Sequence, residues 1–563
     1  MKPEITSSDF VIVGGVAAGP KTAAVLARRL PNASITLFQK GERLSYASCG
    51  LPYFASGDID SIDSLMRTSY GVQRDRIFFR DTKGFSVVTG AEVIQIDRSK
   101  KTIMIKDTAS GETYNHNYGK LILATGARPN PLPFPVPDSS LIRHFTTPDD
   151  ALQFRSLAER GKIGKAAIIG GGFIGCEVAE AAGGIWGIET TLIEKEENLL
   201  PYIFDPEIAA VIERELTRKG IIVKTATEVK KVTVGADSPI ALHLSTGEII
   251  SSDYLFLCLG VRPETVLAKE AGLEIGRSGG IKVNRHLQTS DPDIYAGGDC
   301  IESTHRLTGA PIFLPMGSLA NRHGWVIAEN LAGNPTEFNG VLGTFLLKVF
   351  DLNVGAVGLS ESSSLRSGLE VDSVVGSFAD KPDYYPESKS LTAKMVYEKS
   401  GGRLLGLQVV GAGDICRRID LFSSFLLWQA KLPDLFSFEH GYAPPYAEAL
   451  DPLHQLASLA LAQRRGLNVL KPVDCHSGHP LCLDVREESE FMMDKVERGV
   501  DLAPEVLNIP LGSLRARLDQ LPRDRKIIVV CKRGPRSYQA ALILTAAGFK
   551  DVAILGGGVQ GLL

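Results

Sequence analysis

Two cysteines lie in sequence contexts where a thiol could do chemistry. Cys49 stands alone in SYASCGLPYFASG, and Cys531 ends the apolar run KIIVVC and begins CKRGPRS. A lone redox thiol works by forming a mixed disulfide, a persulfide or a sulfenic acid. At a strand-to-helix turn, backbone N–H groups and nearby cations favour a thiolate or persulfide anion. The cations here are Lys532, Arg533 and Arg536. The alternative is that both cysteines are simply small buried residues.

A glycine-rich turn in the middle of the chain predicts a dinucleotide site. AAIIGGGFIGCEVAEAA has full GxGxxG spacing between an apolar strand and a helix, and the next strand, TTLIEK, ends in Glu194. Such glycines let the backbone approach a pyrophosphate at a helix N-terminus. A carboxylate at Glu194 would accept from a ribose 2′-hydroxyl and repel a 2′-phosphate, which favours NADH, although Lys195 beside it weakens the preference over NADPH. The turn residues are Gly170, Gly172, Ile174 and Gly175.

A second glycine turn lies near the start of the chain. FVIVGGVAAG is followed by an expected helix at 21–30 and the strand SITLFQK, which is a βαβ pattern. It keeps three glycines but has Val16 at the second GxGxxG position, so a plain tight turn is the alternative. LILATGARP and IYAGGDC are further strand–turn pieces. Their order predicts a nucleotide fold that starts near residue 11, is interrupted near 165 and resumes near 280.

This order of motifs resembles the pyridine nucleotide–disulfide oxidoreductases that bind two dinucleotides. The resemblance implies FAD in the first fold and NAD in the second. In that family an acid at the end of the second strand holds the FAD ribose, whereas this chain has Gln39, whose amide can still bond a hydroxyl. The resemblance assigns the FAD site to Gly14, Gly15, Ala17, Gly19, Gln39, Lys40, Val93, Ala124, Gly126, Arg128 and Asp299.

Two further parts of the chain also resemble known domains. The mixed strands and helices from about Glu337 resemble the dimerisation domain of that family. The last ninety or so residues resemble one rhodanese domain through DVR at Asp484–Arg486, CKRGPRS and the final LGGG. Four residues separate Cys531 from Arg536, against five in related phosphatases, and the tighter loop suits a sulfane sulfur.

We therefore expect an α/β chain with two Rossmann-like folds, an α+β dimerisation domain and a C-terminal α/β rhodanese domain. The expected ranges are 1–150 with 270–335 for FAD, 151–269 for NAD, 336–463 for dimerisation and 474–563 for the rhodanese.

The bulk composition narrows the function classes. Of 563 residues, 44% are hydrophobic and 22% charged, which is ordinary for globular domains. The net charge of -4 gives no reason to expect nucleic acid or a membrane surface as partner. The first residues, MKPEITSSDF, do not resemble a signal peptide, and no apolar run predicts a spanning helix. Eight scattered cysteines, Cys475 and Cys482 among them, show no metal-ligand pattern, so we expect no metal and a cytoplasmic protein with reduced thiols.

SYxxCGLPY around Cys49 resembles the single-cysteine subgroup of the family. That subgroup comprises coenzyme A-disulfide reductases, NADH oxidases and peroxidases, and NADH-dependent persulfide reductases. Peroxidases and oxidases carry a histidine where this chain has Ala17, which disfavours peroxide. The reductases carry two tyrosines that reach Cys49 of the partner subunit in a homodimer. KPDYYPES and HGYAPPYAEALDPL match those segments, and a rigid aromatic turn is the alternative. The roles are assigned to Tyr384 and Tyr442, with Tyr385 and Tyr446 as second choices.

The resemblance implies a reaction as well as a fold. NADH would deliver hydride to FAD, Cys49 would attack the outer sulfur of a persulfide, and Cys531 would load or relay sulfane sulfur. Persulfide, polysulfide and coenzyme A disulfide are not separated by the sequence. Coenzyme A binding stays open, because Val25 occupies the place of an arginine that many relatives use for its phosphates. The alternatives are coenzyme A-disulfide reduction as the main activity, an NADH oxidase, a sulfur-carrier or redox-sensing protein, and an electron-transfer flavoprotein.

Overall fold

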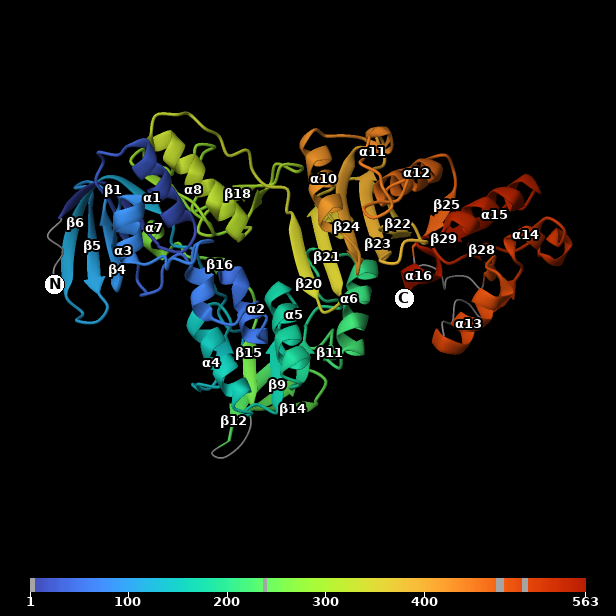
Figure 1. Cartoon of the computed structure of the whole chain (residues 1–563), viewed down its shortest axis with the longest axis horizontal. Coiled ribbons are helices and arrows are strands. Elements are labelled where there is room, and N and C mark those ends of the chain that lie inside the picture. Colours follow the sequence, from blue (N-terminus) through green and yellow to red (C-terminus); the bar gives the residue numbers. More distant parts are fainter. Residues whose placement is uncertain (1–5, 236–239, 472–479, 499–504, 563) are drawn as a thin grey trace. The chain divides into compact units, whose positions relative to one another are not determined.

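The computed structural model describes residues 6–235, 240–471, 480–498 and 505–562. Cys475 and the predicted start of the rhodanese range at 474 lie outside these residues. The chain forms two compact units. Unit 1 comprises Met1–Lys195 and Thr227–Val341, and unit 2 comprises Glu196–Ala226 and Leu342–Leu563 (Figure 1).

The first nucleotide fold of unit 1 is built on a mixed sheet. β1, β2, β3, β6 and β17 run parallel, while β4, β5 and β6 form an antiparallel meander. β17 pairs with the end of β6, so the returning chain completes the sheet, as the order of motifs predicts. In sheet order the strands are β3 (Ser86–Val88), β2 (Ile35–Phe38), β1 (Ser7–Val13), β6 (Thr113–Leu123), β5 (Thr102–Asp107) and β4 (Ala91–Asp97), with β17 (Ile294–Ala296) beside β6.

Helices pack tightly on this sheet. α1 and α8 lie against each other, and a Cβ added to Gly324 of α8 would come 2.6 Å from the carbonyl oxygen of Ala18 in α1 (Figure 1). Only glycine permits that approach. The helices of this fold are α1 (Ala18–Arg29), α2 (Leu51–Ser56), α3 (Arg76–Phe78), α7 (Val266–Glu270) and α8 (Gly317–Leu331), and the short pair β18 (Ser303–Thr304) and β19 (Pro311–Ile312) precedes α8.

The interrupting segment forms a second nucleotide fold in unit 1. Its strands run parallel, and the central pair is largely apolar and buried, as expected for a sheet covered on both faces. In order they are β10 (Glu189–Ile193), β9 (Lys165–Ile169), β15 (Tyr254–Leu257) and β8 (Ile142–His144), with helices α4 (Pro148–Glu159) and α5 (Phe173–Glu180). The antiparallel sheet β12 (Val229–Val234), β13 (Ile240–Leu244) and β14 (Ile249–Ser252) adjoins it, and β7 (Ala127–Pro129) pairs with β16 (Val261–Pro263) where the chain enters and leaves.

Unit 2 contains an antiparallel five-stranded sheet with helices packed on it. Every residue of β24 is buried, because α10 packs against it together with α6. The strands in order are β20 (Phe345–Val349), β21 (Leu352–Gly358), β24 (Leu404–Gly411), β23 (Ser390–Glu398) and β22 (Val371–Ala379). The accompanying elements are α6 (Pro206–Arg218), β11 (Ile222–Lys224), α9 (Glu361–Arg366), α10 (Cys416–Leu427), α11 (Leu432–Ser437) and α12 (Pro452–Arg464).

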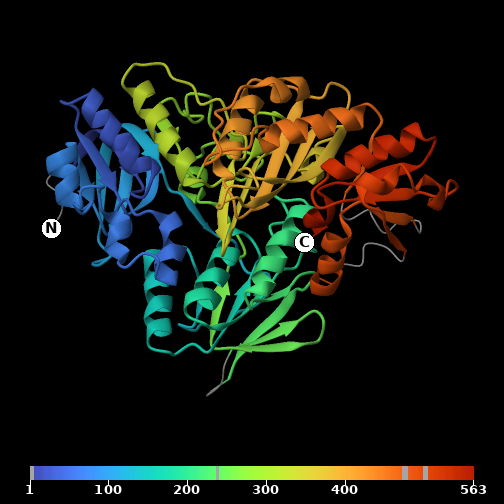
Figure 2. The same cartoon turned by 45° about the vertical axis from the view of Figure 1, so that its right-hand side comes forward.

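The C-terminal part of unit 2 is a parallel five-stranded sheet with helices. Its central strands, β26 and β28, are buried throughout. The strands in order are β25 (Asn468–Leu470), β29 (Val552–Leu555), β28 (Ile527–Val530), β26 (Leu481–Asp484) and β27 (Val506–Asn508). The helices are α13 (Glu488–Arg498), α14 (Leu511–Leu514), α15 (Pro535–Ala546) and α16 (Gly558–Leu562), and α16 also packs against β22 of the antiparallel sheet (Figure 2).

The helix expected at 21–30 begins earlier in the structure, at Ala18 of α1. α15 begins at Pro535, four residues after Cys531. Proline is tolerated in a first helical turn, where its missing N–H would have no intrahelical partner. Among the residues searched, no helix combines the length and apolarity needed to cross a membrane.

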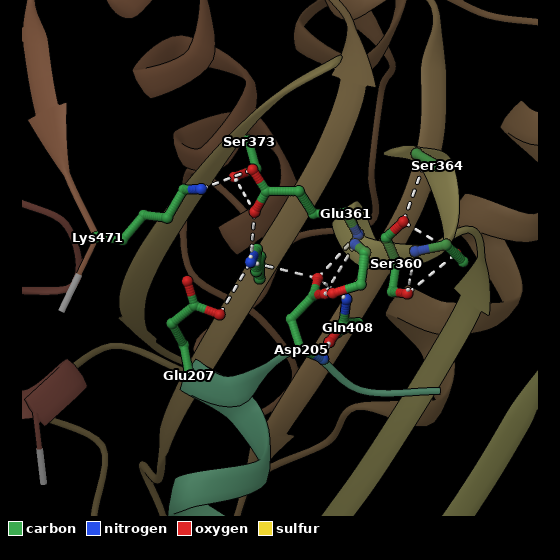
Figure 3. Close-up of polar contacts among 11 residues, drawn as sticks. Asp205, Glu207, Ser360, Glu361, Ser364, Ser373, Gln408 and Lys471 are labelled. Carbon is green, nitrogen blue, oxygen red and sulfur yellow. Dashed lines mark hydrogen bonds and ion pairs between the residues drawn. The ribbon is translucent and has the colours of Figure 1, made fainter. Parts of the chain in front are cut away.

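A buried lysine joins three segments of unit 2. Lys394 on β23 is about 1% exposed, and its ammonium lies 3.2, 2.8 and 2.8 Å from carboxylates of Asp205, Glu207 and Glu361. Figure 3 shows these acids converging, with Lys471 reaching Glu361 at 2.6 Å. Burial alone would lower the pKa of Lys394, but the three carboxylates together raise it. The ammonium is therefore charged and holds α6, α9 and β23 together.

Replacing this lysine should destabilise unit 2 severely. In Lys394→Met three carboxylates lose their shared cation, and breaking a buried pair costs about 3–5 kcal/mol. We expect the melting temperature of the least stable calorimetric transition to fall by roughly 10 °C, given about 2–4 °C per kcal/mol for a unit of this size. The control is Lys282→Met, which removes an exposed pair with Glu274 and should shift melting by no more than about 2 °C. Equal shifts in both variants would contradict this account.

Candidate active site

Cys49 sits at the start of a short helix in the first nucleotide fold. It lies in the 3₁₀ turn Ser48–Gly50, directly before α2, and Pro52 occupies the first turn of that helix. The residue is exposed. A Cβ added to Gly50 would lie 2.4 Å from the side chain of Leu65, so glycine after the thiol allows the turn to pack closely.

The inserted nucleotide fold holds the helix that follows Cys49. The guanidinium of Arg155 on α4 donates to the carbonyl oxygens of Phe54 and Ile59, at 3.1 and 2.7 Å. Trp186 donates its indole N–H to the carbonyl oxygen of Ala55 at 2.7 Å. Residues about a hundred positions apart in the sequence therefore fix the thiol relative to the second nucleotide fold.

Two carboxyl groups influence the Cys49 thiol. Partial displacement of water around the sulfur is the largest cause that raises the pKa of Cys49, and the charges of Glu177 and Asp299 raise it further. Burial raises the pKa of Glu177 to about 7 and that of Asp299 to about 6. Gly317, the first residue of α8, also lies beside the sulfur, because an added Cβ would be 3.9 Å from Sγ. The thiol thus has acids of near-neutral pKa around it.

The two glycine turns are built in the same way. The N–H of Gly15 donates to Oε1 of Gln39 at 2.7 Å, and the N–H of Gly171 donates to Oε2 of Glu194 at 2.7 Å. In each fold the side chain directly after the second strand accepts a hydrogen bond from the glycine turn and so supports it. Gln39 therefore does in the first fold what the carboxylate does in the second.

The glycines of the two turns have two different roles, close strand contact and open space at a helix start. A Cβ on Gly14 would be 2.1 Å from the Ala124 carbonyl oxygen, and one on Gly170 would be 2.3 Å from that of Cys258. These glycines are required for strand contact. Gly172, at the N-cap of α5, has no atom within 4 Å of an added Cβ. Open space over helix N–H groups suits a pyrophosphate, so the residues fit the cofactor.

Two of the predicted FAD-site residues are cations that form ion pairs within the protein. Lys40 pairs with Glu92 at 2.7 Å, and Arg128 pairs with Glu264 at 3.4 Å. Most of the remaining predicted positions lie in or beside the glycine turns, and Val93 lies on a strand. Ala17 and Gly19 flank the start of α1, with Gly19 closing on Gly14, Val93 lies on β4, and Gly126 follows β6; Ile174 and Gly175 lie in the first turn of α5.

The two predicted tyrosines meet in unit 2. The side chains of Tyr384 and Tyr442 interact, and the Tyr442 hydroxyl is the main cause that raises the pKa of Tyr384. Both rings are exposed. Tyr385 instead lies under the Lys381 ammonium, 5.6 Å from its ring centre, and Tyr446 is exposed. The structure therefore pairs the first-choice residues rather than the second choices.

Cys531 lies at the bottom of the loop before α15. It is about 1% exposed, and the Gly534 N–H donates to its sulfur at 3.1 Å. Gly534 has φ +131°, a conformation that favours glycine. The buried Asp484–Arg486 pair of the DVR motif, at 2.7 Å, is a structural contact within the same sheet edge.

The loop around Cys531 is less positive than its sequence indicates. Arg533 donates to both carboxylate oxygens of Asp383 at 2.9 and 3.0 Å. Arg536 donates to both oxygens of Glu490 at 2.6 and 2.9 Å, and this bond lowers the pKa of Glu490 to about 2. Two of the three predicted cations are therefore paired with acids from distant segments.

Sequence reasoning missed several residues of these sites. Glu177 lies inside the glycine-motif helix and Asp383 directly precedes Tyr384, but only folding shows their partners. Ser537, in the first turn of α15, is fully buried and its hydroxyl has no hydrogen-bond partner. In the searched part of the chain, no three His, Cys, Asp or Glu side chains gather as a metal-binding group.

Comparisons with known proteins cover nearly the whole chain. Residues 8–313 match the pyridine nucleotide-disulphide oxidoreductase family, 345–454 match its dimerisation domain, and 471–563 match the rhodanese-like domain. An NAD(P)H coenzyme A polysulfide/persulfide reductase of Pyrococcus horikoshii is 34% identical over 79% of this chain and 97% of its own. Two solved structures match as well. They are an NAD-dependent persulfide reductase from A. fulgidus (36% identity, TM-score 0.94, covering 98% of this chain and 100% of that one) and a reduced CoADR-RHD of Bacillus anthracis (32%, 0.89, 99% and 98%).

The raised pKa of Cys49 predicts how the rate of its alkylation depends on pH. Its thiolate is a minor species at pH 7, so alkylation by iodoacetamide should accelerate about tenfold per pH unit between pH 7 and 8. Glu177→Gln removes a charge that raises this pKa, and alkylation at pH 8 should become roughly two- to fivefold faster. Below pH 6 Glu177 is protonated, so variant and wild type should converge. Mass spectrometry of the Cys49 peptide gives the rates.

A neighbouring carboxyl provides the control. Glu180 lies on the same helix but is not among the charges that raise the pKa of Cys49. Glu180→Gln should leave the rate at pH 8 within about 1.5-fold of wild type. The influence assigned to Glu177 is wrong if both variants react equally, or if the Glu177→Gln effect persists unchanged at pH 5.5.

Proposed function

The chain belongs to the pyridine nucleotide-disulphide oxidoreductase family, and from that premise we propose that it is an FAD-dependent NADH oxidoreductase for sulfane-sulfur and disulfide substrates. Persulfides, polysulfide or coenzyme A disulfide would be reduced at Cys49, and the rhodanese domain would transfer sulfane sulfur through Cys531. The observation that carries the proposal is a lone thiol, Cys49, held on the first nucleotide fold by contacts from the second.

Both nucleotide folds have the residues to hold their cofactors. FAD would lie over Gly14, Gly15 and Gly19 with Gln39 toward its ribose, and NADH would lie over Gly172 with Glu194 toward its ribose. When bound, the two cofactors supply hydride transfer and the electrons that reduce sulfur. NADPH stays the alternative nucleotide.

The chain itself supplies the sulfur chemistry. The Cys49 thiolate would attack the outer sulfur of RSSH, forming a Cys49 persulfide and releasing RSH once the leaving thiolate takes a proton. Glu177, whose pKa is about 7, is suited to exchange that proton near neutral pH. The overall balance is NADH + H⁺ + RSSH → NAD⁺ + RSH + H₂S.

A homodimer fits the second half of the site. The match to the dimerisation domain supports dimerisation, and both Tyr384 and Tyr442 are exposed, as residues that serve a partner subunit must be. We propose that this pair completes the site at Cys49 of the partner subunit. We also propose that the domains span the ranges expected from the sequence. The proposed location of the protein is the cytoplasm.

Coenzyme A disulfide reduction remains the second candidate activity. The position at which relatives carry a phosphate-binding arginine is Val25, and it is buried in α1. Of the other cations on that helix, Arg29 pairs with Glu329 at 2.7 Å. Tight binding of the coenzyme A phosphates on α1 would therefore depend on Lys21 or Arg28. Ala17, directly before α1, stands where the oxidases of the family carry a histidine. This chain therefore lacks the histidine expected of an NADH oxidase.

Replacing the two cysteines separately should divide the activities. Cys49→Ser should lower NADH oxidation with a small persulfide by about 100-fold or more, because the nucleophile is gone, while FAD stays bound and reducible by NADH. Cys531→Ser should remove transfer of sulfane sulfur from thiosulfate to cyanide yet keep part of the small-persulfide reductase activity. Stopped-flow flavin absorbance and steady-state NADH consumption measure these effects.

Two results would sink the proposed function. One is full persulfide turnover in Cys49→Ser. The other is a wild-type enzyme that reduces only an added electron-carrier protein and no persulfide, polysulfide or disulfide. The second outcome would favour the electron-transfer alternative.

The nucleotide preference can be tested without breaking the glycine turn. Glu194→Gln keeps an oxygen to accept from Gly171, as Gln39 does for Gly15, but removes the negative charge. The kcat/KM ratio of NADH over NADPH should fall by roughly tenfold, which corresponds to about 1.4 kcal/mol of lost repulsion. An unchanged ratio would show that Glu194 does not select the nucleotide.

A further inference from the structure

The rhodanese sheet is joined to the antiparallel sheet by backbone contact. A Cβ on Gly556 would lie 2.8 Å from the Val375 carbonyl oxygen on β22, and one on Gly557 would lie 3.1 Å from the Ser377 hydroxyl. Lys471, directly after β25, pairs with Glu361 of the Lys394 cluster (Figure 3). The C-terminal glycines and the connecting segment thus fix this domain within unit 2.

The Cys531 loop is held by the same C-terminal helix. The N–H of Val559 donates to the Cys531 carbonyl oxygen at 2.9 Å, and the N–H of Gln560 donates to that of Lys532 at 3.0 Å. The side chain of Gln560 accepts from Nε of Arg533 at 3.1 Å. The bond to Gln560 therefore orients the guanidinium of Arg533 toward Asp383 independently of the ion pair.

Arg533 connects this loop to the tyrosine pair. Its guanidinium contacts both oxygens of Asp383, and Asp383 directly precedes Tyr384, whose side chain interacts with Tyr442. Arg533 itself lies two residues after Cys531. Two segments about 150 residues apart, each carrying a predicted functional side chain, therefore meet at one ion pair.

The Asp383 carboxylate is not needed to shape its own loop. The loop is closed by a backbone bond from Asp380 to Lys389, by the Lys389 N–H on the Asp380 carboxylate, and by the Ser388 hydroxyl on the Lys381 carbonyl oxygen. Asp383 is exposed, and exposed ion pairs stabilise proteins by only about 0–1 kcal/mol. The Asp383–Arg533 pair therefore contributes little to the free energy of unfolding, and its main effect is to position the Cys531 loop.

We propose that Asp383 is a positioning residue that holds the Cys531 loop beside the Tyr384–Tyr442 pair, so that an acceptor thiol bound at the tyrosines takes sulfane sulfur directly from Cys531. The inference rests on the proposed function for its purpose. In the step, the acceptor thiolate RS⁻ attacks the outer sulfur of Cys531–S–SH, the S–S bond to Cys531 breaks, and RSSH and the Cys531 thiolate result. A donor such as thiosulfate reloads Cys531 and leaves as sulfite.

The test compares two acceptors on the full-length holoenzyme, with thiosulfate as donor. Cyanide needs no tyrosine pair, whereas a thiol acceptor such as glutathione does. Asp383→Asn should raise the KM for the thiol about fivefold or more, leave its kcat within twofold, and leave transfer to cyanide within twofold. Asp383→Glu should restore most of the thiol KM, because a carboxylate can again reach Arg533. Tyr384→Phe should raise the same KM, and the double variant should show less than the product of the two effects.

Glu490→Gln is the matched control. It unpairs Arg536, the other arginine of the same loop, which does not face the tyrosine segment. Any loss there should affect cyanide and thiol equally. The inference is overturned if Asp383→Asn changes both acceptors in proportion, or if the wild type transfers no sulfur to thiols. None of these assays uses NADH, so failure of the proposed reductase function would appear separately, as a lack of NADH oxidation with preformed persulfide.

Discussion

The buried ammonium of Lys394 is the constraint on which the arrangement of unit 2 depends. A charge so far from water is tolerated only with compensating charges, and here three acids supply them. Asp205 in addition accepts from the Glu361 and Ser362 N–H groups at the start of α9. One side chain thus fixes α6, α9 and the sheet to each other. Segments that are unrelated in sequence must fold together for any of them to be stable.

This cluster also reaches the site chemistry. Glu361 bonds Lys394 and Lys471, and Lys471 directly follows β25, so an edge strand of the rhodanese sheet is tied to the same charges. From there the glycines of the C-terminus approach β22, and Arg533 approaches Asp383. The Cys531 loop is consequently part of a docked domain. If sulfur passes from this docked loop as we propose, the acceptor must come to the loop, and Tyr384 directly follows the Asp383 that contacts it.

In unit 1 the packing of the two nucleotide folds fixes the position of one thiol, that of Cys49. Duplicated turns use Gln39 and Glu194 in equivalent roles. Contacts from α4 and from Trp186 then clamp the helix behind Cys49. The same packing brings Glu177 near the sulfur and removes water from its carboxyl group, which raises the pKa of Glu177 to about 7. The electrostatic surroundings of Cys49 follow from how the two folds pack, not from the cysteine motif itself.

The sequence by itself determined the local elements and their order. Glycines at fixed spacing, apolar strands and the lone Cys49 are local patterns, because strand–turn–helix geometry depends on neighbours in the chain. Tertiary structure alone decided which charges meet. Arg533 and Arg536 read as free cations in CKRGPRS, yet Asp383 and Glu490 pair with them. Lys394 likewise pairs with Asp205, Glu207 and Glu361, none of which is near it in the sequence. Charge pairs between distant segments leave no periodic signal, since a side chain's partner is set by folding rather than by its neighbours.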